Sequence, residues 1–148
     1  TDGDRGPRSL VLHTMEIGAE ILDIPLSEPK GVVELDSRDF ASLCLDSLKL
    51  GEDGCFNLKE STLEIETSGD LGAANFSIVA NERNKVFNRG YDEKVRFNWK
   101  YLSSFSKAKV SAPRVQLHFV QGNPLKVLFQ VAKGGTLVFY LAPRHDFQ

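Results

Sequence analysis

Two runs rich in β-branched and aromatic residues form the clearest pattern of the sequence. They are Leu125–Ala132 and Thr136–Leu141, and the pair Gly134–Gly135 lies between them. Because glycine adopts positive φ without a steric penalty, the pattern predicts a tight hairpin of long antiparallel strands. Pro143 has no backbone N–H for a strand ladder, so we expect the sheet to stop there.

Two other segments have the periodicity of amphipathic helices. The first is capped by Asp36 or Ser37 and extends to about Leu50. The second is the short segment Trp99–Ala108, which presents Leu102 and Phe105 to the core. On the first helix the predicted buried face consists of Phe40, Leu43, Cys44 and Ser47, and the predicted exposed side consists of Arg38, Ser42, Leu45 and Lys49.

Short strands with apolar and polar residues in alternation surround these helices. We expect strands at Gly31–Leu35, Cys55–Leu58, Leu63–Thr67, Asn75–Val79, Lys94–Asn98 and Arg114–Val120, a short strand within Ser9–Glu16, and a loop or an irregular strand in Asn81–Asp92. The order of one strand, one helix and three strands therefore occurs twice. It predicts an α+β fold, a duplicated β-α-β-β-β unit with about eight strands and two helices on one face.

The composition is that of a globular domain. The chain has 148 residues, of which 41% are hydrophobic, enough for one domain with a packed core. No apolar run approaches the ~20 residues that a membrane-spanning helix needs, so we expect no membrane partner. The two cysteines lack metal-site spacing and the three histidines lie far apart, which predicts no metal site. Since the sequence has no P-loop and no recognisable catalytic triad, we expect neither a cofactor nor an enzymatic activity.

An apolar stretch, Ile21–Pro25, lies within acidic sequence near the start of the chain. Pro25 and Pro29 exclude a regular helix, so we interpret residues 18–31 as a linker that crosses a surface. We expect this stretch and the end of the hairpin, Tyr140–Pro143, to form one partner-binding surface. The alternative is that the apolar side chains only attach the linker to the sheet.

Charge is segregated along the chain although the net charge is only −2. Residues 16–36 contain six acidic side chains and one base, whereas residues 98–114 contain four bases and no acid. A nearly neutral chain argues against general nucleic-acid binding, but a local basic face can contact phosphates. The alternative is an ordinary solvated face.

Several short motifs, taken in their order and spacing, resemble those of the proliferating cell nuclear antigen family, the ring-shaped sliding clamps of DNA replication. The motifs are Leu22-Asp23-Ile24-Pro25, Phe40-Ala41, Ser68-Gly69-Asp70-Leu71-Gly72, Tyr101-Leu102 with Phe105, Lys107 and Ala108, Pro124-Leu125, and Tyr140-Leu141-Ala142-Pro143. The resemblance spans roughly Leu10 to Pro143. It implies three regions: residues 1–17 are a lead-in with the last strand of an N-terminal clamp domain, residues 18–31 are the interdomain connector, and residues 32–148 are the C-terminal clamp domain.

The resemblance implies a non-enzymatic processivity factor. In this family three two-domain protomers close a ring around duplex DNA, and polymerases, nucleases and ligase insert the aromatic-bearing turn of a PIP box under the connector. Carried over by position, the partner-binding residues are Leu22, Ile24, Pro25, Pro124, Tyr140, Leu141, Ala142 and Pro143. The expected partners are double-stranded DNA of any sequence, PIP-box proteins and other clamp protomers, as a homotrimer in a full-length parent. The expected location is the nucleus of a eukaryote, or otherwise the cytoplasm with DNA.

By the same resemblance, the two helices line the DNA hole. Lys100 and Lys107 match basic positions of the family, and Lys49 and Lys109 add to them. The chain departs from the family where Ser42 and Leu45 replace basic side chains of the first helix and Glu34 replaces a common lysine. We expect weaker DNA contact, because each lost phosphate contact lowers the salt dependence of binding by about one. These departures favour an alternative function: a clamp-like checkpoint subunit or paralogue that acts as a protein-interaction scaffold with weak DNA contact.

The resemblance also implies a subunit interface at a sheet edge. In the family, the strand that matches Ala73–Val79 pairs with the strand of a neighbouring protomer that matches Ser9–Met15. The expected interface residues are Ala73, Ala74, Asn75, Phe76, Ser77, Ile78, Val79, Leu10 and Leu12. An uncharged edge strand aggregates unless it is paired, so we expect head-to-tail association through these strands.

Overall fold

The computed structural model describes residues 10–11 and 28–144. In this part of the chain it has ten strands and two α-helices, the second of which is followed by a 3₁₀ turn. The strands are β2 (Leu10–Val11), β3 (Gly31–Asp36), β4 (Asp53–Leu58), β5 (Thr62–Gly69), β6 (Gly72–Val79), β7 (Lys85–Asn88), β8 (Lys94–Asn98), β9 (Arg114–Phe119), β10 (Leu125–Gln130) and β11 (Thr136–Leu141). The helices are α1 (Ser37–Leu50) and α2 (Trp99–Phe105), and the 3₁₀ turn is η1 (Ser106–Val110).

The strands are divided between two sheets. One sheet has the order β2-β11-β10-β9-β3-β7 and the other has the order β6-β5-β4-β8. Each predicted unit gives its first strand to the sheet of the other unit, because β3 pairs with β9 and β8 pairs with β4. The duplicated unit is therefore confirmed, and its strands form two sheets that exchange the first strand of each unit. β2 lies in the region where a short strand was expected, and β7 lies in the region expected to be a loop or an irregular strand.

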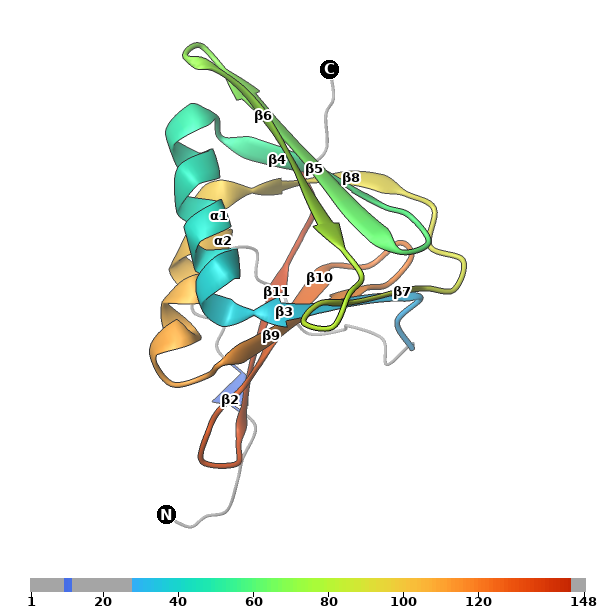
Figure 1. Cartoon of the computed structure of the whole chain (residues 1–148), viewed down its shortest axis with the longest axis vertical. Coiled ribbons are helices and arrows are strands. Elements are labelled where there is room, and N and C mark those ends of the chain that lie inside the picture. The colour runs from blue at the N-terminus through green and yellow to red at the C-terminus, as the bar shows by residue number, and fades with distance from the viewer. Residues whose placement is uncertain (1–9, 12–27, 145–148) are drawn as a thin grey trace.

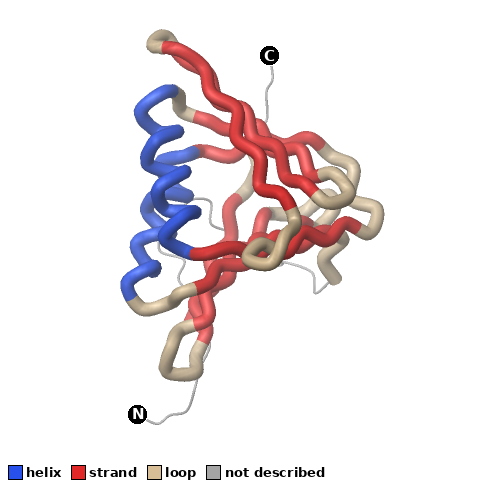
Figure 2. The backbone as a smooth tube through the Cα atoms, viewed as in Figure 1, coloured by secondary structure: helices blue, strands red, loops and turns tan. Residues whose placement is uncertain are grey.

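Both helices lie on the same side of the molecule, as expected, and they run next to one another (Figure 1). The tube view shows the strands to the right of the helices, with β7 on the side away from the helices (Figure 2). No helix among the described residues is both long and apolar enough to span a membrane.

Helix α1 begins and ends where its sequence predicts. The carboxylate of Asp36 accepts the backbone N–H of Arg38 at 2.8 Å and that of Asp39 at 3.4 Å, which satisfies two free donors of the first turn. Gly51 follows the last turn and donates its N–H to the Ser47 carbonyl at 3.0 Å. The buried face contains Phe40, Cys44 and Ser47, with Leu43 partly buried against the core, and the predicted opposite side is exposed.

The second helix is shorter than predicted. Asn98 caps it by accepting the N–H of Lys100 at 2.8 Å, and Leu102 and Phe105 are buried as expected. The α-helical pattern stops at Phe105 rather than at Ala108, and η1 continues the chain. At this point the Ser106 hydroxyl donates to the Ser103 carbonyl at 2.9 Å, a local bond that competes with a further α-helical turn.

The predicted hairpin is present, with a longer connection. β10 and β11 pair antiparallel from Leu125 opposite Leu141 to Gln130 opposite Thr136. Of the two glycines in the connection, Gly134 has a positive φ of 104° and Gly135 does not. Five residues connect the strands instead of a tight two-residue turn. The extra length lets Ala132 donate its N–H to the Ser111 carbonyl at 3.0 Å, which ties the hairpin tip to the segment after η1.

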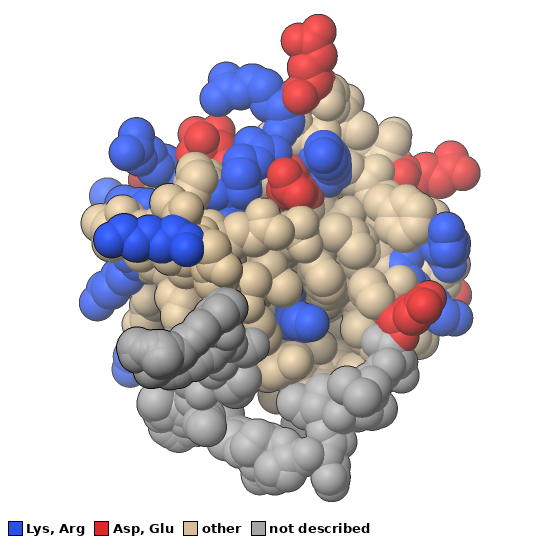
Figure 3. Space-filling view, turned by 90° about the horizontal axis from the view of Figure 1, so that it is seen from below, with Lys and Arg blue, Asp and Glu red and all other residues tan. Residues whose placement is uncertain are grey.

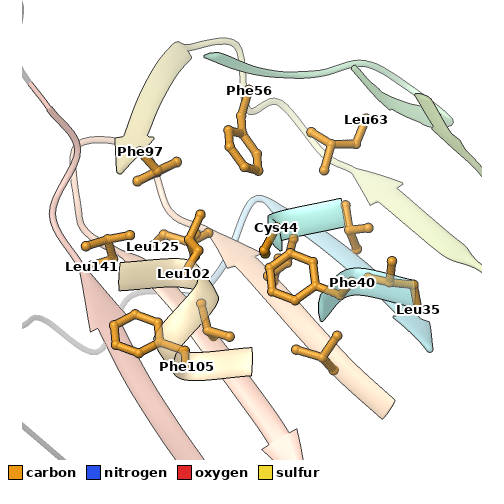
Figure 4. Packing of buried hydrophobic residues seen from close by; sticks show 14 of the residues in the cluster. Leu35, Phe40, Cys44, Phe56, Leu63, Phe97, Leu102, Phe105, Leu125 and Leu141 are labelled. Carbon is orange, nitrogen blue, oxygen red and sulfur yellow. The ribbon is translucent and has the colours of Figure 1, made fainter. Parts of the chain in front are cut away.

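The core fills the space between the two sheets and the helices. Phe56 and Leu63 of the four-stranded sheet point toward Phe40 and Cys44 of α1, as Figure 4 shows. The aromatic rings are in close contact. Phe56 and Phe97 pack edge to face with ring centroids 5.3 Å apart, and Phe105 stacks on Phe139 with ring centroids 4.4 Å apart. Burial of these rings by both sheets and both helices makes the two units one packed body.

Candidate partner-binding, DNA-facing and subunit surfaces

The segment after β11 forms one end of a groove between the two sheets. A cavity of about 580 Å³ there is lined by Pro124, from the turn before β10, and by Pro143. The same cavity contacts β8, the outermost strand of the four-stranded sheet, so it has both apolar and charged walls. Its lining residues are Cys55, Glu93, Lys94, Val95, Arg96, Gly122, Asn123, Pro124, Pro143 and Arg144.

Arg144 fixes this segment to the other sheet. Its backbone N–H donates to the Arg96 carbonyl at 2.8 Å, as an isolated antiparallel bridge to β8. Its guanidinium lies 3.4 Å from Asp53 Oδ1, an ion pair without hydrogen-bond geometry. No motif predicted this connection, because Asp53 and Arg144 come from distant parts of the sequence.

The other predicted pocket residues occupy different environments. Tyr140 is half-buried, and its burial raises the pKa of the phenol. Leu141 is buried in the hydrophobic core, whereas Ala142 is exposed. The structure thus brings Pro124 and Pro143 together in one cavity, and Tyr140 lies three residues before Pro143 along the chain. The connector residues Leu22, Ile24 and Pro25 lie outside the described residues.

A polar network crosses the face of the six-stranded sheet that carries Tyr140. Glu34 accepts hydrogen bonds from Arg114 Nε at 3.1 Å and from Gln116 Nε2 at 3.0 Å. Burial alone raises the pKa of Glu34, but the bonds from Gln116 and Arg114 and the charges of Arg114 and Lys85 outweigh it and lower the pKa. Glu34, a departure from the family pattern, therefore has partners that keep it ionised.

His118, two residues after Gln116 on β9, extends this network. Its Nε2 lies 2.8 Å from Gln116 Oε1, and because Gln116 gives its amide N–H to Glu34, His118 is the donor in this pair. Partial burial and the charge of Lys126 lower the pKa of His118 to about 4. The imidazole is therefore neutral near pH 7, with its proton on Nε2.

The predicted DNA-facing lysines are carried by the two helices and the 3₁₀ turn. Lys49 lies in the last turn of α1, Lys100 in the first turn of α2, and Lys107 and Lys109 in η1. Lys109 is half-buried and the other three are exposed. In a view from below, the margin on the side of the helices carries mainly Lys and Arg side chains (Figure 3). Ser42 and Leu45 are also exposed on α1, and Leu45 is 49% accessible.

The predicted interface strand is an edge strand. β6, which contains Ala73–Val79, has only β5 as a ladder partner among the described residues. Ile78 is buried, whereas Val79 is 48% exposed. On the other side of the predicted interface, Leu10 lies in β2, which pairs in parallel with β11 of its own chain; Leu12 lies outside the described residues. Pairing of this segment with a neighbouring β6 stays a prediction.

The residues described here contain no group of three or more side chains of the His, Cys, Asp or Glu type that could hold a metal ion. Burial raises the pKa of the Cys44 thiol, since this side chain lies in the core under α1.

Comparison with known proteins identifies the family. Residues 23–144 match the family model described as proliferating cell nuclear antigen, C-terminal domain. A curated relative, the probable DNA polymerase sliding clamp of Autographa californica nuclear polyhedrosis virus, is 31% identical over 134 residues. The match covers 90% of this chain and 52% of the relative, so the chain spans about half the length of that protein. The chain belongs to the proliferating cell nuclear antigen family of sliding clamps, and it corresponds to the C-terminal domain of that family.

Proposed function

We propose that this protein is a non-enzymatic clamp module that tethers DNA polymerases and other replication and repair proteins to duplex DNA. The observation that carries the proposal is the position of α1 and α2, next to one another on one side of the molecule, with exposed Lys49, Lys100 and Lys107. Lysines on a rigid helical surface can contact phosphates without reading bases. This is the requirement for a protein that slides along DNA.

The DNA contact is proposed to be weak. Leu45 and Ser42 occupy exposed positions of α1 and offer no positive charge, and Asp46 on the same helix is exposed and acidic. Retention on DNA would then depend on ring closure rather than on affinity. The relative's length is consistent with a second domain in the complete ring protomer, and we propose a homotrimer in the full-length parent.

Partner recruitment is assigned to the groove at the end of the chain. Pro124 and Pro143 supply apolar walls, and the Arg144 bridge to β8 holds the segment that contains Pro143 in place. An extended segment with a short apolar turn suits such a groove, because backbone groups can hold the turn while side chains fill the cavity. The proposed ligand is a PIP-box peptide, with Leu22, Ile24 and Pro25 of the connector on its other side.

The test is a titration of the chain with a peptide of the form Q-x-x-hydrophobic-x-x-aromatic-aromatic. We expect binding in the micromolar range, about −8 kcal/mol, and its loss in Tyr140→Ala and Ile24→Ala. Lys133→Ala, an exposed change at the hairpin tip, is the matched control and should bind normally. Absence of binding by a folded wild-type sample would contradict the tethering function.

The alternative, a clamp-like checkpoint subunit or scaffold paralogue, is favoured by the exposed Leu45 and Ser42. It predicts peptide binding without measurable duplex binding. Titration of a short duplex at low salt separates the two functions. Weakening of duplex binding by Lys100→Ala and Lys107→Ala supports the clamp, and absence of any duplex binding supports the scaffold.

A further inference from the structure

β7 lies on the side of the molecule away from the helices (Figure 1), and exposed side chains form a row at alternate positions along it. Alternate residues of a strand share one face, and Val86 packs against the core, so Lys85 and Phe87 lie on the opposite face. The row continues into both flanking turns, with Arg83 before β7 and Arg89 after it. The sequence predicts a loop or an irregular strand in this region, although its odd-numbered positions from 83 to 89 carry three cations and one aromatic ring.

Phe87 and Arg89 form a pair at the centre of this row. The ring of Phe87 is 42% exposed, and the guanidinium carbon of Arg89 lies 4.9 Å from the ring centroid. An exposed aromatic ring beside a guanidinium offers two planar groups on which a nucleobase can stack. Arg89 also continues the strand ladder, because its N–H donates to the Lys30 carbonyl.

Side-chain hydrogen bonds fix both turns that carry the arginines. Asn81 Oδ1 accepts the N–H groups of Arg83 and Asn84 at 2.7 and 2.8 Å. Asn88 Oδ1 accepts the N–H of Tyr91 at 2.7 Å, and Asn88 Nδ2 donates to the Tyr91 carbonyl at 3.0 Å. The charged row is thus presented on an ordered backbone, which lowers the entropy lost when a ligand binds.

The charges of the row itself are all positive. Four exposed bases lie on it or beside it, namely Lys30, Arg83, Lys85 and Arg89. The acids of the neighbouring strand and turns are Glu28, Glu34, Asp36, Glu82, Asp92 and Glu93. Glu34 is paired with Arg114 and lies opposite Lys85, Asp36 caps α1, and Asp92 and Glu93 accept hydrogen bonds from Gln121. The row can therefore present its own positive charge to a polyanion.

We propose that this surface, formed by Lys30, Arg83, Lys85, Phe87 and Arg89 and named here the β7 surface, binds single-stranded DNA. Cations in a line can contact successive phosphates, and Phe87 can stack on an unpaired base. The base faces of a duplex are already stacked on one another, so the exposed ring of Phe87 could not stack on them. The β7 surface is separate from the helices to which duplex contact is assigned, and this site goes beyond the clamp function.

The experiment measures binding of labelled oligo(dT) and of a short duplex by fluorescence anisotropy over a range of salt concentrations. We compare the wild-type chain with Arg83→Gln/Lys85→Gln/Arg89→Gln and with the matched triple Lys49→Gln/Lys100→Gln/Lys107→Gln. The β7 triple variant should bind oligo(dT) at least tenfold more weakly. Its slope of log K against log salt should also be smaller by about two, at about 0.7 for each lost phosphate contact. The duplex binding of this variant should be unchanged. The variant Lys49→Gln/Lys100→Gln/Lys107→Gln should show weaker duplex binding and unchanged oligo(dT) binding.

A second variant tests stacking without a change in charge. Phe87→Ala should weaken oligo(dT) binding about tenfold with an unchanged salt slope, and Phe87→Trp should restore it. Circular dichroism checks that each variant is folded. Three results would overturn the proposal: no binding of oligo(dT) by the folded wild-type chain at low salt, equal loss in both triple variants, or tighter binding of polyglutamate or oligo(U) than of oligo(dT). Loss of duplex binding alone bears on the clamp function and leaves this site intact.

Discussion

The indole Nε1 of Trp99 donates a hydrogen bond to the hydroxyl of Thr67 across 3.0 Å, and both side chains are buried. Trp99 is the first residue of α2, and Thr67 lies on β5, so this bond joins the second unit of the fold to the first. The ring of Trp99 also lies against Gly54, where an added Cβ would be 2.3 Å from the ring. The bond therefore sets the position from which α2 presents Lys100.

Thr67→Val should lower the free energy of unfolding by about 1–3 kcal/mol, because it leaves a buried indole N–H without a partner while it preserves the side-chain shape. Thr62→Val, at a half-buried position of the same strand, is the control and should have a small effect. Urea denaturation followed by tryptophan fluorescence measures both. Equal stability of Thr67→Val and the wild type would show that the hydrogen bond is unimportant.

The end of β5 packs directly on the end of α1. A Cβ built on Gly69 would lie 1.8 Å from the Leu50 carbonyl oxygen, which is backbone and cannot rotate away. Gly69→Ala should therefore shift the β5–β6 hairpin and destabilise the chain by about 1–3 kcal/mol. Gly135→Ala meets no atom within 4 Å and should be nearly neutral. Thermal unfolding of the two variants makes the comparison, and similar melting temperatures would argue against a tight contact.

Acid should destabilise the chain in the range where His118 titrates. The pKa of His118 is about 4 in the folded chain, against 6.5 for an ordinary histidine, so the unfolded chain takes up a proton first. Stability is fully present above pH 6.5 and falls as the pH decreases toward 4. The lowered pKa of Glu34 extends this loss to lower pH, since the folded form retains the carboxylate after the unfolded form is protonated.

His118→Gln tests this account, because glutamine does not titrate and can still donate to Gln116. Its unfolding free energy should change less between pH 6.5 and 4.5 than that of the wild type. Urea midpoints at a series of pH values give both curves. Parallel curves would mean that another group causes the acid lability.

Local patterns in the sequence were sufficient for the elements whose structure depends on neighbours along the chain. The capped start of α1, its buried face and the pairing of β10 with β11 follow from residues a few positions apart. The division into two sheets does not, because β3 pairs with β9 from Gly31 opposite Phe119 to Asp36 opposite Arg114, and no short pattern along the chain records that choice. The same holds for Asp53 and Arg144, which meet only after both sheets form.

The candidate sites show the same difference. The order of the motifs was sufficient to identify the family, whereas a partner-binding role of Pro124 and Pro143, which line one cavity, stays a prediction. The sequence predicts only a loop or an irregular strand at β7, because two of its four residues are polar and only Val86 packs against the core. The signal was present as a period of two, but it marked a charged face rather than an apolar one.

Association of the chain should depend on the free edge of β6. We expect the wild-type chain to self-associate as its concentration rises, because β6 is uncharged and, in the part of the chain that the structure describes, has one open edge. Val79 is 48% exposed on this strand, so Val79→Lys places a charge there without disturbing the core and should yield a monomer. Val110→Lys changes an 85% exposed valine at the end of η1 and should associate like the wild type. Light scattering over a wide concentration range gives the masses, and a monomeric wild-type chain at every concentration would refute the edge as an assembly surface.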